Sequence, residues 1–268
     1  MTSLSPDPLL APALVCIDEF YARMFRDWPT AVTRHEDNCT LSFSGDRHLT
    51  GANHLWPHTP DALTHRALDI AEEFFTTHAA AWSVMYIDTF LPRAATLLGD
   101  RGYFPRWSSP LMVLDRAPHP LPVRADTTVI RATTPRHLDD VTRVMAEAFA
   151  TGDSVNQRVV RATHLNDPAI IHYLVYADGE PAGCATVALH AGMAGIWNVG
   201  TRHVFRRQGY ASTIMLGLLD DLRAYGYRAS ALMASPSGQP LYERLGYRHV
   251  ALVTYMGPPF IRKPRPLL

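Results

Sequence analysis

The sequence predicts an α/β fold in which two halves are joined by a proline-rich segment. In the second half, short β-branched runs alternate with stretches whose apolar residues recur every three or four positions, which is typical of strands and amphipathic helices. Pro118, Pro120 and Pro122 exclude regular structure between the halves. A weak internal repeat supports this division, because TLLGDRGY at 96–103 and PLYERLGY at 240–247 each follow a predicted helix and strand.

The second half is predicted to begin with a strand at 127–131 and a helix at 135–150. Pro135 suits the first turn of that helix, because the N–H that proline lacks has no helical partner there. A second helix is expected near 155–165. The further elements are strands at 169–177 and 181–189 joined by a turn at Asp178-Gly179, a strand at 195–201, a helix at 210–224, a strand at 228–234, a short helix at 239–245 and a strand at 249–255.

The first half has weaker signals. Helices are expected at 8–25, 61–80 and 92–98, and strands at 40–43, 52–56, 82–87 and 110–114. Aligned on the repeat, this half looks like a degenerate copy of the second, and an unrelated helical cap is the alternative. We therefore predict a first domain at 1–117, a linker at 118–125, a second domain at 126–262 and a tail at 263–268.

The composition predicts a folded cytoplasmic protein. Hydrophobic residues make up 47%, and 25 basic residues balance 25 acidic ones, which argues against a nucleic-acid partner. The first residues lack the basic region of a secretory signal, and no apolar run approaches the ~18 residues of a membrane span. Cys16, Cys39 and Cys184 are too few and too scattered for a disulfide framework or a metal cluster. Monomer and homodimer both stay open.

The most informative segment, NVGTRHVFRRQGYAST at 198–213, leads from a strand into a helix. The start of a helix presents unpaired N–H groups at the positive end of the helix dipole. Gly209 and Ala211 leave room for an anion to approach the backbone, and Arg206 and Arg207 add positive charge. The segment therefore predicts a cradle for a pyrophosphate. A basic turn that only begins a helix is the alternative.

After one more strand comes SPSGQPLYERLGY at 235–247. This segment, the RRQGYA junction at 206–211 and the order of elements together resemble the GNAT superfamily of acyl-coenzyme A-dependent N-acyltransferases, over about 127–257. The resemblance implies a GNAT fold with mixed, mostly antiparallel sheets, and two tandem GNAT-like domains of which the first is degenerate. The sequence departs from the family at His203, where proline is common, and this position should be a surface turn.

The resemblance also implies an acyl-coenzyme A site, with acetyl-CoA as the first choice. The strand end around Val199 and Thr201 should bulge and hold the acyl carbonyl and the pantetheine arm. The helix start and the Arg206 side chain should hold the pyrophosphate, while Arg244 is expected near the 3′-phosphate. The cofactor-binding residues expected in this way are Val199, Gly200, Thr201, Arg206, Arg207, Gln208, Gly209, Tyr210, Ala211, Ser212, Ser235, Tyr242 and Arg244.

Three residues are expected to act in catalysis. By the resemblance, Tyr242 protonates the leaving thiolate, and a buried core aromatic is the alternative for it. The backbone N–H of Val199 stabilises the oxyanion, and Asn198 orders a relaying water.

A general base is harder to assign, because the strand at 195–201 contains no acid. His172 and His190 lie on neighbouring strands and titrate in the right range. Asp153 could contact a cationic acceptor. A structural or surface role is the alternative for each, and direct loss of the amine proton to solvent is the remaining option.

Other residues have simpler interpretations. His54 and His58 are expected at the surface rather than on zinc, and Cys184 in the core. Leu98 stands where the repeat has Tyr242 and cannot donate a proton. Four aromatic residues of the first half either line the acceptor side or pack in a core, namely Phe43, Trp56, Trp82 and Trp107.

Two functions follow from these observations. The first is an acetyl-CoA-dependent N-acetyltransferase that acts on a primary amine of a small molecule, amino acid or peptide, with natural products among the options. The second is a non-catalytic acyl-CoA-binding or interaction module. The predicted cradle serves both functions, and the proton donor expected at Tyr242 favours the first.

Overall fold

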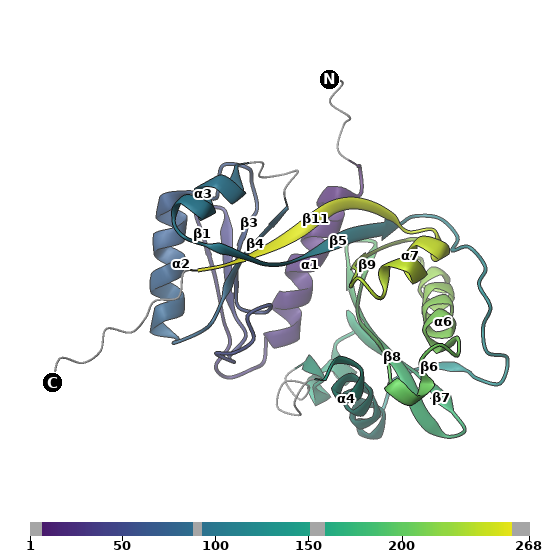
Figure 1. Cartoon of the computed structure of the whole chain (residues 1–268). Helices are drawn as coiled ribbons and strands as arrows, with labels where there is room; N and C mark the ends of the chain where they lie inside the picture. The colour runs from purple at the N-terminus through teal and green to yellow at the C-terminus, as the bar shows by residue number, and fades with distance from the viewer. Residues whose placement is uncertain (1–6, 88–92, 151–158, 259–268) are drawn as a thin grey trace. The chain divides into compact units, whose positions relative to one another are not determined.

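The computed structural model of the chain describes residues 7–87, 93–150 and 159–258, which fall into two compact units (Figure 1). Unit 1 consists of Met1–Trp28 and Pro110–Ala251, and unit 2 of Pro29–Ser109 and Leu252–Leu268. None of the helices in the described part of the chain is long and apolar enough to cross a membrane.

Unit 1 carries most of the predicted second half. Its elements are α1 (Leu10–Phe25), β6 (Val129–Arg131), α4 (Pro135–Phe149), the 3-10 helix η1 (Ala162–Asn166), β7 (Ile170–Ala177), β8 (Glu180–His190), β9 (Met193–Thr201), the 3-10 helix η2 (His203–Phe205), α6 (Tyr210–Ala224), β10 (Ala229–Met233) and α7 (Gln239–Leu245). Two strands, β5 (Phe104–Leu114) and β11 (Arg248–Gly257), have residues in both units.

The sheet of unit 1 is mixed and mostly antiparallel. Strands β6, β7, β8 and β9 pair in antiparallel order, β9 and β10 are parallel, and β10 is antiparallel to the end of β5. The parallel pair is short, because it ends at Leu232 opposite Ile196. The predicted sheet type is confirmed.

Side chains alternate between the two faces of this sheet. On β7 and β8, Tyr173 and Val187 pack with α6 in one core, whereas Leu174 and Cys184 pack with α4 in another. Helix α6 therefore covers one face, and α4 lies on the other (Figure 1). Cys184 is the buried core residue that the sequence predicted.

Helix α1 also lies on the α4 face of the sheet, next to β8 and β9. The Phe20 ring stacks on Trp197 of β9 with 3.9 Å between ring centroids. Cys16 lies so close to Gly195 that a Cβ there would be 3.2 Å from the sulfur. The compact units therefore do not follow the linear boundaries 1–117 and 126–262, since the N-terminal helix packs with the second half of the chain.

Unit 2 also contains paired strands. Its elements are β1 (Val32–Glu36), β2 (Cys39–Phe43), β3 (His54–Pro57), α2 (His65–Thr77), β4 (Ser83–Ile87) and α3 (Ala94–Asp100). Strands β1, β2 and β3 are antiparallel, β3 and β4 are parallel, and β4 pairs antiparallel with β11. Unit 2 therefore contains strands as well as helices and is not purely helical.

Most predicted elements occur within a few residues of their expected bounds, and α6 and α7 match them fully. Helix α2 begins at His65 rather than at 61, because the Thr64 side chain accepts a hydrogen bond from the N–H of Ala67 and caps the helix. The predicted helix near 155–165 lies partly outside the described residues, and its end is the 3-10 helix η1. Strand β1 was not predicted. It joins β2 through Asp37 and Asn38, which both have positive φ.

Candidate active site

A cavity of about 790 Å³ opens in unit 1 where β9 ends and where α6 and α7 begin. Of the fourteen residues that the sequence predicts for the site, Asn198 and Gln208 do not line this cavity. The Gln208 side chain donates instead to the Val204 carbonyl, at 2.9 Å. The other twelve line the cavity together, namely Val199, Gly200, Thr201, Arg206, Arg207, Gly209, Tyr210, Ala211, Ser212, Ser235, Tyr242 and Arg244.

The end of β9 contains the predicted bulge. Gly200 pairs with Cys184 and Trp197 with Thr186, so Asn198 and Val199 together face the single residue Ala185. Asn198 adopts a positive φ of 53°, which lets the strand absorb the extra residue. A bulge takes one residue out of the ladder, and this is what an oxyanion-binding N–H at Val199 requires.

The predicted cradle lies at the start of α6. Gly209 stands at the N-cap with φ 90°, and no side chain caps the first turn. The first turn contains no acidic residue, so the N–H groups at the start of α6 can receive an anion. The proline-rich segment lies beside this turn, because the Ser212 hydroxyl donates to the Pro122 carbonyl at 2.9 Å.

Arginine side chains surround the cavity. Arg206 donates from Nε to the Thr201 carbonyl (3.2 Å) and from Nη2 to the Ala148 carbonyl (2.9 Å). It therefore joins the end of β9 to the last turn of α4, and the positive charge lies at the cavity wall. Arg207 and Arg244 line the same cavity, so the charge beside the cradle is positive.

Tyr242 of α7 is buried at the wall of the cavity, with 7% of its surface exposed. Burial raises the pKa of its hydroxyl to about 12. Ser235 lies just beyond the point where β9 and β10 cease to pair, as predicted for two strands that part. Its hydroxyl oxygen accepts a hydrogen bond from the Gly238 N–H at 3.1 Å.

A second, smaller cavity of about 260 Å³ adjoins the first. Phe149, Val199, Ser235 and Tyr242 line both cavities. Of these two cavities, Asn198 lines only the smaller one. The residues expected to act in catalysis therefore lie where the two cavities meet or next to that point.

The two candidate histidine bases do not line either cavity. His172 is buried and joins a chain of hydrogen bonds with Thr186 and His164. His190 lies at the end of β8, with its Nδ1 3.8 Å from the Glu19 carboxylate. Asp153 lies outside the described residues.

Sequence reasoning missed several residues that line the cavities. Phe149 was assigned to the apolar stripe of α4, yet it is 43% exposed and lines both cavities. The spacing of apolar residues shows which face of α4 is buried, but it does not show where along the helix the sheet beneath that face ends and a cavity begins. Met145, Trp197 and Met233, which line the smaller cavity, come from three different elements. Only the fold brings these together.

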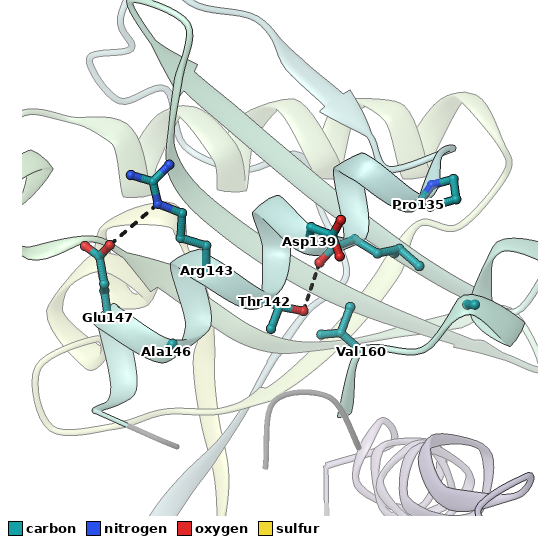
Figure 2. A pocket seen from close by; sticks show the side chains of 9 residues that line it. Pro135, Asp139, Thr142, Arg143, Ala146, Glu147 and Val160 are labelled. Carbon is teal, nitrogen blue, oxygen red and sulfur yellow. Dashed lines mark hydrogen bonds and ion pairs between the residues drawn. The ribbon is translucent and has the colours of Figure 1, made fainter. Parts of the chain in front are cut away.

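A third cavity, of about 520 Å³, lies along the outer side of α4 and is shown in Figure 2. Asp139, Arg143 and Glu147 line it, and Arg143 points toward Glu147, with 3.8 Å between the charged atoms. It shares no residue with the two cavities above. Arg143 also lies 3.0 Å from the Glu180 carboxylate and Glu147 2.8 Å from Arg202, so both side chains already have charged partners in the protein.

In unit 2, Leu98, Phe43 and Trp82 pack in the core, and Trp56 is also buried. Trp107 is 39% exposed and stacks on Tyr255, with ring centroids 4.4 Å apart.

The sequence was wrong about His54, which is buried in β3 rather than exposed. Burial lowers the pKa of His54 to about 4. His58 is exposed as expected, with Nε2 2.6 Å from the Thr40 hydroxyl. Among the residues of the described part of the chain, no group of three or more His, Cys, Asp and Glu side chains is placed to hold a metal ion.

Residues 138–247 match the model of the Acetyltransferase (GNAT) family. A search of curated proteins found no match. Among solved structures, a GCN5-related N-acetyltransferase from Kribbella flavida is 18% identical in sequence, with a TM-score of 0.73. The alignment covers 93% of this chain and 95% of the Kribbella chain. One from Sphaerobacter thermophilus is 17% identical over 93% and 91% of the two chains, with a TM-score of 0.63.

A tandem GNAT protein from the clavulanic acid biosynthesis pathway is also similar, at 13% identity, with 90% of this chain and 86% of that chain covered and a TM-score of 0.62. At these identities the likeness concerns the fold, and it extends along nearly the whole chain. The predicted fold class is confirmed. Residues 138–247 therefore match a domain of the GNAT family, within a chain that has the fold of GNAT proteins.

Proposed function

We propose that the protein transfers an acyl group, acetyl first of all, from an acyl-coenzyme A to a primary amine. The observation that carries this proposal is the meeting of two cavities at Val199 and Tyr242. The larger cavity leads from that point to the cradle at α6, and the smaller one leads away from it. This is the arrangement that a two-substrate transfer requires, with one substrate on each side of the reacting carbon.

The larger cavity fits an acyl-coenzyme A in its chemistry. The first turn of α6 has no acid and no capping side chain, so its N–H groups suit the pyrophosphate. Gly209 has a φ of 90°, a left-handed conformation that glycine adopts without strain and that forms the N-terminal turn of α6. Arg206, Arg207 and Arg244 add positive charge along the wall. When bound, the acyl-coenzyme A supplies an activated thioester.

The protein's own residues would act at the junction of the cavities. Val199 lies in the bulge, and its backbone N–H would stabilise the negative charge on the carbonyl oxygen. Tyr242 would donate its hydroxyl proton to the departing thiolate. Because its pKa is raised to about 12, this hydroxyl is protonated throughout the neutral range and can act as an acid.

The amine would lose its proton to solvent before it attacks. Among the described residues, none of those lining the smaller cavity is an acid or a histidine. The rate should therefore rise with pH until the amine itself is deprotonated.

The alternative is a module that binds acyl-CoA without turnover. Two measurements on the full chain separate the two functions. Titration calorimetry with acetyl-CoA tests the larger cavity, and release of free thiol in the presence of amines tests the transfer. The proposed function predicts binding and amine-dependent thiol release. Binding without release with any amine would support the module, and absence of binding would exclude both functions.

A further inference from the structure

The smaller cavity has an unusual lining for a site that would receive an amine. Among the residues that the structure describes there, every lining side chain is uncharged. Most are apolar, with Met145 and Phe149 from α4 and Met233 from β10. At about 260 Å³, the cavity is also below the ~300–1,000 Å³ typical of drug-sized ligands.

The position of this cavity indicates which substrate it would hold. Val199 and Tyr242 line both cavities, and Asn198 lines only the smaller one. The larger cavity leads to the cradle, so the coenzyme would fill it. An amine that attacks a carbonyl carbon held at Val199 must then arrive from the smaller cavity.

One polar side chain at the wall of the smaller cavity is held in a fixed orientation. The amide nitrogen Nδ2 of Asn198 donates to the hydroxyl of Thr186 at 3.4 Å. The Thr186 hydroxyl oxygen lies 2.9 Å from Nδ1 of His172. Nε2 of His172 lies 3.0 Å from Nδ1 of His164, so the hydrogen-bonded side chains continue from Asn198 to His164.

This series of hydrogen-bonded side chains is electrically neutral and buried. Thr186, His172 and His164 are each at most 5% exposed. Burial lowers the pKa of His172 to about 3 and that of His164 to about 4, so neither carries a charge at neutral pH. The series therefore orients Asn198 without adding charge to the cavity, and it leaves Oδ1 as the atom that can accept from a ligand.

We infer that the acceptor is a primary monoamine whose remaining atoms are apolar, and that its amino group donates a hydrogen bond to Oδ1 of Asn198. This inference rests on the proposed acyl transfer. The apolar part of the amine would lie against Met145, Phe149 and Met233. Asn198 would act as a positioning residue for the amine, and it would not take the proton.

The same lining disfavours charged acceptors. A second ammonium or a carboxylate on the amine would be buried without a partner among the described residues, and an unpaired charge in an apolar site is costly. Polyamines, amino acids with a free carboxylate and polycationic sugars are therefore expected to be poor substrates.

Three amines of one chain length test this inference on the full-length protein. Butylamine, 1,4-diaminobutane and 4-aminobutanoate differ only in the group at the far end. The kcat/KM from thiol release should be about a hundred-fold higher for butylamine than for either charged analogue. 2-Phenylethylamine tests whether a larger apolar group also fits.

Two variants test the role of Asn198. Asn198→Gly keeps the positive φ at this position and removes the amide, so the KM for butylamine should rise about ten-fold with little change in kcat. Affinity for acetyl-CoA and thermal stability should stay at the wild-type values, which a purely structural role would not predict. Asn198→Asp, which also tolerates this φ, should hold the proton on the amine and move the rise of rate with pH to higher pH.

The outcomes separate this inference from the proposed function. If 1,4-diaminobutane or 4-aminobutanoate reacts as well as butylamine, the inference is overturned while acyl transfer stands. An unchanged KM in Asn198→Gly would overturn the role of Asn198 in the same way. If acetyl-CoA binds but no amine releases thiol, the proposed function fails and the inference fails with it.

Discussion

Replacing Tyr242 by phenylalanine should reduce acyl transfer and leave stability almost unchanged. The same change at Tyr247 should lower stability and leave acyl transfer almost unchanged. The two rings are neighbours, with centroids 5.9 Å apart, and both are buried. The Tyr247 hydroxyl lies 2.8 Å from Oγ of Ser230. Within the described residues, the Tyr242 hydroxyl has no such hydrogen bond, and its residue lines both cavities. The pair is therefore a matched test of one hydroxyl against another.

The expected effects on stability follow from these contacts. Tyr247→Phe removes one buried hydrogen bond and leaves the Ser230 hydroxyl, which is buried, without its partner. The net cost should be about 1–2 kcal/mol of unfolding free energy, and each kcal/mol lowers the melting temperature by roughly 2–4 °C in a protein of this size. Tyr242→Phe keeps the ring and breaks no hydrogen bond in the described structure, so its cost should stay within about 0.5 kcal/mol.

The expected effects on catalysis are opposite. Loss of a general acid typically costs ~10²–10⁴ in rate, so we expect Tyr242→Phe to lower kcat about a hundred-fold or more. Because burial raises the pKa of Tyr242 to about 12, the hydroxyl keeps its proton between pH 6 and 9. The ratio of wild-type to variant rates should therefore be constant across that range.

The assay measures thiol release with butylamine at saturating acetyl-CoA, together with calorimetric melting and acetyl-CoA affinity. Affinity should change little in either variant, which shows that the coenzyme still binds. If Tyr242→Phe keeps more than half of the wild-type kcat, or if Tyr247→Phe loses as much activity as Tyr242→Phe, the assignment of the proton donor is refuted.

Three further predictions concern other parts of the chain. Burial lowers the pKa of His54 to about 4 and that of His172 to about 3. The free energy of unfolding should therefore fall as pH drops from 6.5 toward 4, because over this range only the imidazoles of the unfolded state gain a proton. Melting curves at several pH values measure this effect, and a melting temperature that does not change with pH would contradict it. Gly200→Ala should lower the free energy of unfolding by about 1–3 kcal/mol, because the new Cβ would lie 2.9 Å from the Cβ of Ala148. Gly99→Ala in α3, where no atom lies within 4 Å of the new Cβ, should be neutral or stabilise by up to about 1 kcal/mol in the same melting assay. Arg206→Gln should weaken acetyl-CoA binding about ten-fold at low salt and less at high salt in calorimetry, and equal loss at both would argue against a charge effect.

Local sequence signals predicted helix α6 well. Gly209 and Gly226 mark the two ends of α6, and the apolar residues between them follow the helical period, so the element and the residues at its start are set by neighbours in the chain. The bulge at Val199 was expected from the resemblance and occurs in β9.

The sequence could not predict contacts between distant segments. The smaller cavity is lined by Met145, Trp197 and Met233, which no local period relates to one another. The position of α1 depends on the stacking of Phe20 on Trp197, and nothing near Phe20 in the chain indicates that partner. His54 stands in a short strand whose burial depends on the strands paired to each side of it. In each case tertiary packing decides the environment, and local propensity does not.

The packing of α1 on β9 has a consequence for how the chain folds. The Cys16 sulfur lies against the carbonyl of Ala188, 172 residues further along the chain. During synthesis α1 would leave the ribosome before β8 and β9, and its apolar face would stay uncovered until both strands had followed. Contacts of such large sequence separation slow folding, because the loop must close before they form. We therefore expect refolding of this unit to be limited by the docking of α1.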